Sequence, residues 1–114
     1  MTGVQTCALP ILTQNQIGEL YAERQAAALG ERSNDFVFMD GSQKFGFGVM
    51  IETRDQPTGR AAGSYSWGGI YNTYFWVDPS ADLAGVLLAQ TTPFADAAVY
   101  GAYERFEKAA YGSR

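Results

Sequence analysis

The strongest constraint on the fold is a succession of four strand-like segments joined by short turns. The segments cover residues 45–51, 64–69, 71–77 and 84–90. They are rich in aromatic and β-branched residues or glycine, and turn formers such as Asp78-Pro79-Ser80 separate them. Strands joined by connections this short pair in antiparallel fashion, so the sequence predicts an antiparallel sheet.

Two of these segments carry more specific expectations. In residues 45–51 (FGFGVMI) every second residue is apolar, which predicts a single strand with Phe45, Phe47, Val49 and Ile51 on one face. Residues 84–90 (AGVLLAQ) form a nearly continuous apolar run, which is typical of a central strand covered on both faces. Because the chain offers this last strand a partner on one side only, we expect an open apolar edge.

A helix is expected before the strands. Within residues 13–29, Ile17, Leu20, Tyr21 and Ala28 recur at helical spacing, and Gly30 follows at the position of a C-cap. Residues 31–41 fit either a short strand or a loop.

A second helix is expected after Pro93, and it completes the fold class. Its apolar face would hold Val99, Ala102, Phe106 and Ala109. The charged residues Glu104, Arg105, Glu107 and Lys108 would form a solvated face, and Asp96 near the start suits the helix dipole. The predicted class is therefore α+β, an antiparallel sheet flanked by an N-terminal and a C-terminal helix.

The first eleven residues, MTGVQTCALPI, stand apart from this pattern. They carry no charge, match no secondary-structure pattern and lack the basic start and long apolar centre of a signal peptide. They resemble the conceptual translation of a short-read sequencing adapter. We therefore assign residues 1–11 as an artefactual segment and residues 12–114 as the protein, which would begin inside a domain.

The charge balance excludes two classes of partner. Eight lysines and arginines face twelve aspartates and glutamates, for a formal net charge of −4. No basic stripe could neutralise a run of phosphates, so nucleic acid is not an expected partner. No apolar run approaches the roughly 20 residues that span a bilayer, so no membrane segment is expected.

The absence of histidine restricts the chemistry further. Serine or cysteine nucleophiles in Ser-His-Asp and Cys-His sites need an imidazole base, and the sequence has none. Cys7 is the only cysteine, so neither a disulfide nor a zinc site is expected. We expect no metal and no cofactor, and any nucleophilic chemistry would use a lysine or tyrosine base.

Three runs carry a family resemblance. They are residues 63–69 (GSYSWGG), 74–79 (YFWVDP) and 82–90 (DLAGVLLAQ), and in this order they resemble the C-terminal end of the serine beta-lactamase-related hydrolases. The likeness is greatest to the esterase branch, which is related to class C beta-lactamases and D-alanyl-D-alanine peptidases. It covers Leu12 to Arg114 and implies the C-terminal part of a beta-lactamase/transpeptidase-like fold, so the missing N-terminal part of the domain would be the chain's own partner.

The resemblance also implies a substrate cleft. In that family the third active-site motif is usually Lys-Thr-Gly on the strand beside the cleft, and Trp67-Gly68-Gly69 matches it here. By this match the backbone N–H of Ile70 would be an oxyanion-hole donor. Trp67 supplies no cation for a substrate carboxylate, so the expected substrate of the intact parent is a small uncharged ester, with a beta-lactam-like molecule as the alternative.

The family's other two motifs are missing. No Ser-x-x-Lys occurs, because Ser42-Gln43-Lys44 has one spacer too few, and no Tyr-x-Asn occurs, because Tyr71 and Asn72 are adjacent, on opposite faces of the expected strand. We therefore expect no catalytic residue in this chain and no activity from it alone. The parent would be a carboxylesterase with a Ser-Lys-Tyr acyl-enzyme mechanism, or alternatively a beta-lactamase or a D-alanyl-D-alanine peptidase.

A different class of function remains open, a small non-catalytic module that binds sugar or peptide on Tyr65, Trp67 and neighbouring aromatics. Packing is the simpler role for Tyr65, Tyr71, Tyr74 and Trp76. Turn formation is the expected role of Asp78 and Asp82, which flank Pro79.

Overall fold

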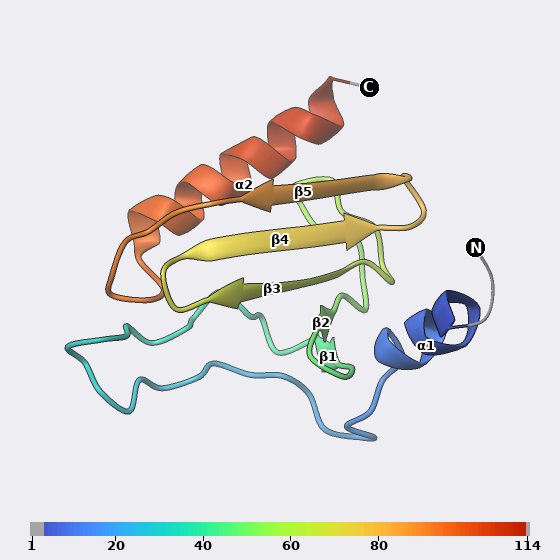
Figure 1. The fold of residues 1–114 in the computed structure, drawn as a ribbon, viewed down its shortest axis with the longest axis horizontal. Coiled ribbons are helices and arrows are strands. Elements are labelled where there is room, and N and C mark those ends of the chain that lie inside the picture. Colours follow the sequence, from blue (N-terminus) through green and yellow to red (C-terminus); the bar gives the residue numbers. More distant parts are fainter. Residues whose placement is uncertain (1–3, 114) are drawn as a thin grey trace.

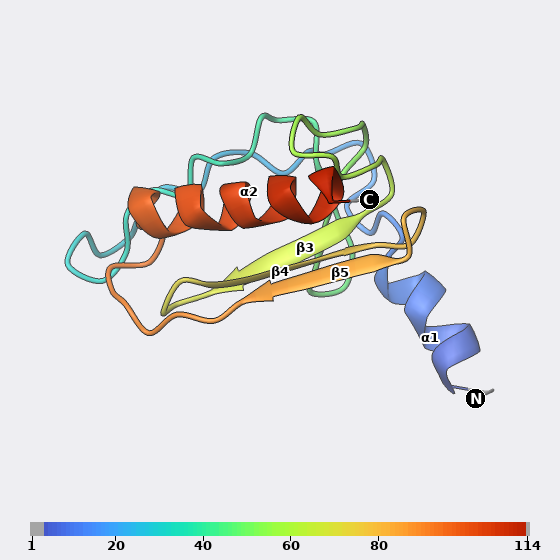
Figure 2. The same cartoon turned by 90° about the horizontal axis from the view of Figure 1, so that it is seen from above.

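The computed structural model describes residues 4–113 and contains one antiparallel sheet of five strands in the order β1-β2-β3-β4-β5. Helix α2 lies across one face of the sheet, whereas the short helix α1 projects from its side (Figures 1 and 2). The elements are α1 (Val4–Leu12), β1 (Lys44–Phe45), β2 (Met50–Ile51), β3 (Tyr65–Gly69), β4 (Thr73–Asp78), β5 (Leu83–Leu87) and α2 (Ala97–Gly112). This confirms the α+β class and the antiparallel sheet.

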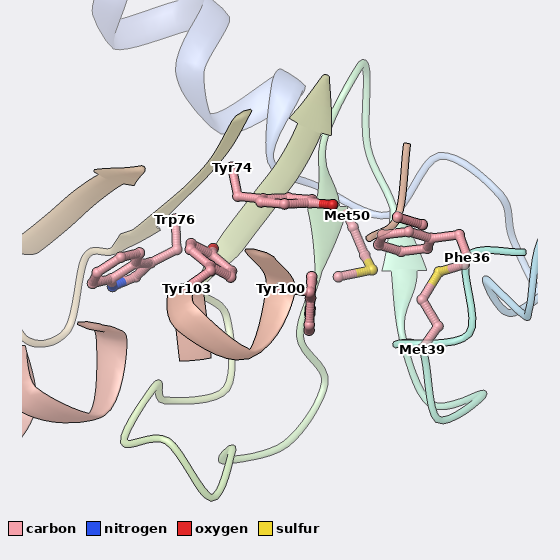
Figure 3. Packing of buried hydrophobic residues seen from close by; sticks show 8 residues of the cluster. Phe36, Met39, Met50, Tyr74, Trp76, Tyr100 and Tyr103 are labelled. Atoms are coloured by element: carbon pink, nitrogen blue, oxygen red, sulfur yellow. The ribbon is translucent and has the colours of Figure 1, made fainter. Parts of the chain in front are cut away.

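An aromatic core joins α2 to the sheet. Tyr74 and Trp76 on β4 face Tyr100 and Tyr103 on α2 (Figure 3). The Tyr74 and Tyr103 rings are 5.2 Å apart, and those of Trp76 and Tyr103 are 5.7 Å apart. The indole of Trp76 lies over Gly85 of β5, where a methyl group would come within 1.9 Å of it. The glycine therefore makes room for the largest side chain of the core.

The buried face of α2 differs from the expected one. Tyr100, Tyr103 and Glu107 are buried, at positions i, i+3 and i+7, whereas Phe106 is 41% exposed. The aromatic residues on the α2 side of β4 set this orientation, because the rings of Tyr100 and Tyr103 both pack against Tyr74 and that of Tyr103 also packs against Trp76. The prediction that Glu107 lies on a solvated face is wrong.

The N-terminal part of the chain corrects two expectations. Residues 13–29 form no helix; they run as irregular backbone with bridges from Ala22 to Gln43 and from Gln25 to Phe36. An Asn15 side chain that accepts from Ile17 N, together with Gly18 at φ +58°, produces a turn where the helix was expected. The N-terminal helix is instead α1, in a segment that was expected to match no secondary structure. The assignment of residues 1–11 as an artefact stays a prediction.

Residues 31–41 form a loop that covers the core rather than a strand. Phe36 and Met39 from this loop are buried beside Met50 and Tyr100 (Figure 3). The apolar residues of the ambiguous segment therefore complete the core without joining the sheet.

The prediction of one strand over residues 45–51 is wrong. The segment folds into a tight hairpin, in which Gly46 N–H donates to Val49 O and Gly48 adopts φ +88°. The two flanking strands have two residues each, and Phe47 at the tip is 58% exposed. Gly48, at positive φ in the centre of the turn, allows this geometry, so the chain reverses where alternation suggested extension.

The last strand is an edge strand rather than a central one. β5 pairs with β4 only, as expected, but it is not covered on both faces, because Val86 is 56% exposed and Leu88, directly after the strand, is 79% exposed. An apolar edge is therefore open within the described chain.

Candidate functional site

The residues matched to the cleft motif lie on a partly unpaired stretch of β3. β3 pairs with β4 along its whole length, from Tyr65↔Val77 to Gly69↔Thr73. The two-residue strand β2 reaches only Tyr65 and Ser66. Residues 67–69 therefore have a strand partner on one side and, among the described residues, none on the other. A free strand edge of this kind offers backbone N–H and C=O groups to an extended ligand.

Trp67 is half-buried at this edge. Its ring lies 4.8 Å from the ring of Phe45 in an edge-to-face arrangement and 6.0 Å from that of Phe36. These neighbours hold the indole in one place, so it presents a fixed apolar surface. Both packing and cleft lining are compatible with this position.

The two glycines differ in their surroundings. A methyl group at Gly68 would lie 2.7 Å from Cδ1 of Tyr74, so the tyrosine ring occupies the space of any side chain there. Gly69 is exposed, and the nearest atom to such a methyl group is Thr73 O at 3.9 Å. Only the first glycine is thus required by packing.

Ile70 begins the turn from β3 to β4. Asn72 N–H donates to Gly69 O over 2.9 Å and closes the turn, and the Ile70 side chain is 53% exposed. Among the described residues the Ile70 N–H donates no hydrogen bond outside the strand ladders. It is therefore free to donate to a carbonyl oxygen placed beside the end of β3.

Ser42 and Lys44, which come nearest to a Ser-x-x-Lys pattern, form hydrogen bonds with other residues. Lys44 Nζ donates to Gly18 O and Leu20 O over 2.9 and 2.7 Å and lies over the Tyr21 ring. The Ser42 hydroxyl donates to Asp40. The structure does not join these two side chains into a nucleophile and base.

Comparison with known families decides the identity of the fold. The model of the Beta-lactamase family matches residues 11–110, which is most of the chain. The chain belongs to the beta-lactamase family.

Solved structures agree with this assignment. A mutant of simvastatin synthase from Aspergillus terreus aligns with a TM-score of 0.60 and 32% identity, over 62% of this chain and 19% of that one. The unliganded selenomethionyl form of the enzyme gives a TM-score of 0.59 and 30% identity, over 62% and 18%. The match therefore covers less than a fifth of the length of each of these enzymes. None of the curated proteins compared with the chain matches it.

A buried charged cluster in this beta-lactamase-family chain went unpredicted. Arg60, in the loop before β3, donates through Nε and Nη2 to the two carboxylate oxygens of Glu107, each over 2.7 Å. Thr58 Oγ1 donates to the same carboxylate over 2.5 Å, and Glu52 Oε1 lies 3.8 Å from Arg60 Nη1. The side chains of Glu107, Glu52 and Arg60 are 0%, 4% and 6% exposed.

Glu52 and Arg60 have altered pKa values in this cluster. Burial raises the pKa of Glu52, against the opposing charge of Arg60. Burial alone would lower the pKa of Arg60, but the hydrogen bond to Glu107 and the nearby carboxylates raise it. The cluster ties the loop before β3 to α2. The spacing of Glu107 is the sequence signal for this cluster, because a residue four positions after Tyr103 lies on the same face of the helix.

Asp78 stabilises the turn after β4, as expected, and also contacts α2. It is 1% exposed and accepts from Ser80 N and Oγ, Ala61 N and Tyr111 OH. Burial alone would raise its pKa, but these hydrogen bonds outweigh burial and hold the pKa at about 2. The side chain thus closes the β4–β5 turn and anchors the end of α2.

The described residues contain neither a metal-binding cluster nor a membrane-spanning helix. No three histidine, cysteine, aspartate or glutamate side chains among them are grouped to hold a metal ion. The side chain of Cys7 lies outside the described residues. No helix within residues 4–113 is long and apolar enough to cross a membrane.

Proposed function

We propose that this chain is the C-terminal part of a serine hydrolase and that the intact enzyme hydrolyses carboxylesters through an acyl-enzyme. The observation that carries the proposal is the motif Trp67-Gly68-Gly69, in the place of Lys-Thr-Gly, on a strand edge that β2 leaves open.

The substitution changes which substrate this wall can hold. A lysine would give a substrate carboxylate a charge-assisted hydrogen bond, worth about 1.5–3 kcal/mol. Trp67 offers an indole held by Phe36 and Phe45 instead. An uncharged acyl group gains apolar contact there, whereas an anionic beta-lactam loses its cation. The name of the similar simvastatin synthases also points away from beta-lactams.

Tyr74 supports the same conclusion. Because its ring fills the space beside Gly68, a threonine cannot be placed there without moving a buried tyrosine. The core of this chain is thus adapted to a glycine in the middle of the motif.

In the proposed mechanism, the serine of a Ser-x-x-Lys motif outside this sequence attacks the ester carbonyl. The lysine, with a tyrosine, takes the serine proton and passes it to the departing alcohol, and water then cleaves the acyl-enzyme. This chain contributes the Ile70 N–H, which would stabilise the oxyanion together with the N–H of the nucleophile. The chain by itself would hydrolyse nothing.

Sequencing the source DNA upstream of the Leu12 codon is the first test. An open reading frame that carries Ser-x-x-Lys and then Tyr-x-Asn into Leu12 is the expected result. A stop codon directly upstream would contradict the proposal and favour the aromatic binding module.

Activity of the full-length protein is the second test. We expect kcat/KM for p-nitrophenyl acetate or butyrate to exceed that for the cephalosporin nitrocefin. Trp67→Lys should raise the relative activity on nitrocefin about tenfold or more, and Trp67→Phe, the matched control, should not. A preference for nitrocefin in the parent would instead indicate a beta-lactamase.

A further inference from the structure

Asn72 is the most highly connected polar side chain near the candidate site. It lies in the turn between β3 and β4, is 0% exposed and adopts φ +62°, a left-handed conformation that asparagine tolerates better than most residues. The prediction that Asn72 belongs to a strand is thus wrong.

The carboxamide of Asn72 uses its full hydrogen-bonding capacity. Nδ2 donates to Thr91 O and to Pro93 O, both over 2.8 Å. Oδ1 accepts from Tyr74 OH over 2.9 Å and from Asp96 N over 3.0 Å. Two donors and two acceptor positions are thereby satisfied.

These partners come from three different parts of the fold. Thr91 and Pro93 belong to the segment that links β5 to α2, Asp96 is the N-cap of α2, and Tyr74 lies in the core. Burial raises the pKa of Tyr74 to about 12, so its hydroxyl stays protonated and can donate. The side chain therefore ties the turn to the start of α2 and to the sheet.

The remainder of the turn has little support of its own. Gly69 is exposed, and the side chains of Ile70 and Tyr71 are 53% and 52% exposed. Besides the bond from Asn72 N to Gly69 O that closes it, the turn accepts one backbone hydrogen bond from elsewhere in the described chain, from Thr91 N to Tyr71 O over 3.2 Å, and Thr91 belongs to the same linking segment. A turn that begins with an exposed glycine would otherwise sample several orientations.

We propose that Asn72 is a positioning residue that fixes the direction of the Ile70 N–H toward the substrate carbonyl. The inference rests on the proposed function, since it needs the Ile70 N–H as an oxyanion donor. An oxyanion donor acts only if it is held where the charge develops, and Asn72 is the buried anchor two residues away.

The test uses the full-length enzyme and two variants. Asn72→Gly keeps a backbone that accepts positive φ but removes all four side-chain hydrogen bonds. Asn72→Asp keeps the size and the acceptors but removes both donors. Active sites are counted by titration with a fluorophosphonate, so that unfolded protein is not scored as slow enzyme.

We expect kcat per titrated site on p-nitrophenyl butyrate to fall about tenfold or more in both variants, with KM within about threefold of the parent. Glu107→Gln is the matched control, because it destabilises the fold far from the turn. It should lower the melting temperature and leave kcat per site unchanged. The inference is overturned if Asn72→Gly keeps kcat within twofold, or if Glu107→Gln lowers kcat equally.

A third variant separates this inference from the proposed function. Ile70→Pro removes the N–H at the second position of a turn, where proline is favoured. A loss of about 100-fold in kcat supports the donor role of the Ile70 N–H. If Ile70→Pro shows that loss but the Asn72 variants keep their kcat, the positioning role of Asn72 alone is refuted. If Ile70→Pro is fully active, both the donor and its positioning are wrong.

A structure of the parent inactivated by diethyl p-nitrophenyl phosphate covers the case in which no Asn72 variant folds. We expect Ile70 N within 3.1 Å of a phosphoryl oxygen, with the four Asn72 hydrogen bonds intact. An Ile70 N–H directed away from the phosphoryl group, or an Asn72 side chain released from Thr91 and Pro93, would refute the inference.

Discussion

The carboxylate of Glu107 offers the clearest test of how α2 is held on the sheet. It is fully buried and accepts three hydrogen bonds, two of them from Arg60. Glu107→Gln keeps the volume but removes the charge and sets an NH₂ group against the guanidinium. Arg60 would then have Glu52, at 3.8 Å, as its nearest carboxylate.

The expected cost follows from the burial of the cation. Breaking a buried ion pair on one side costs about 3–5 kcal/mol, because it leaves an uncompensated charge in the interior. At about 1.4 kcal/mol for each factor of ten, the folding equilibrium constant falls roughly 100-fold to several thousand-fold. That loss is a large part of the 5–15 kcal/mol typical of a domain.

Urea denaturation followed by far-UV circular dichroism measures the effect at micromolar concentration. The double variant Arg60→Met with Glu107→Leu removes both charges and should lose much less than the sum of the two single variants, with a coupling of about 2 kcal/mol or more. A loss below about 1 kcal/mol for Glu107→Gln, or additive effects in the double variant, would refute the view that the ion pair is desolvated and coupled.

Three further perturbations test other parts of the fold. Gly85→Ala would place a methyl group 1.9 Å from the ring of Trp76 and should cost about 1–3 kcal/mol in thermal unfolding; an unchanged melting temperature would contradict that packing. Because the folded-state pKa of Asp78 is lowered to about 2, its stabilisation is complete above pH 4 and is lost as the pH falls from about 4 to 2. Asp78→Asn should flatten that part of the plot of unfolding free energy against pH, and an unaltered slope would exclude Asp78 as its source. Leu88→Lys should reduce concentration-dependent association in light scattering, whereas Leu29→Lys, at another exposed position in a loop, should not; equal effects would argue against edge pairing.

The sequence predicted those features of the fold that depend on neighbouring residues. The hairpins β3–β4 and β4–β5 could be placed because aromatic segments alternate with turn formers such as Pro79. The prediction from sequence was wrong where apolar residues recur at helical spacing but do not pack against another part of the fold. Ile17 and Leu20 recur at helical spacing, yet Leu20 is 71% exposed because no surface packs against that side of the chain.

The candidate site shows the same division. Trp67 to Ile70 could be located because the motif is contiguous, and its role in catalysis stays a prediction. Glu107 and Asn72 could not be interpreted correctly, because their partners are distant in sequence. Arg60 lies 47 residues before Glu107, and Thr91 lies 19 residues after Asn72.

The shortness of β2 has a consequence for the size of any ligand that pairs with β3. The open stretch is three residues long, which corresponds to about 10 Å at the rise of a strand. A molecule that extends past Trp67 toward Ser66 meets the β1–β2 hairpin. If β3 holds the substrate as proposed, the hairpin limits the length of ligand that can pair with it, and a relative whose β2 is two residues longer should accept shorter ligands at this edge.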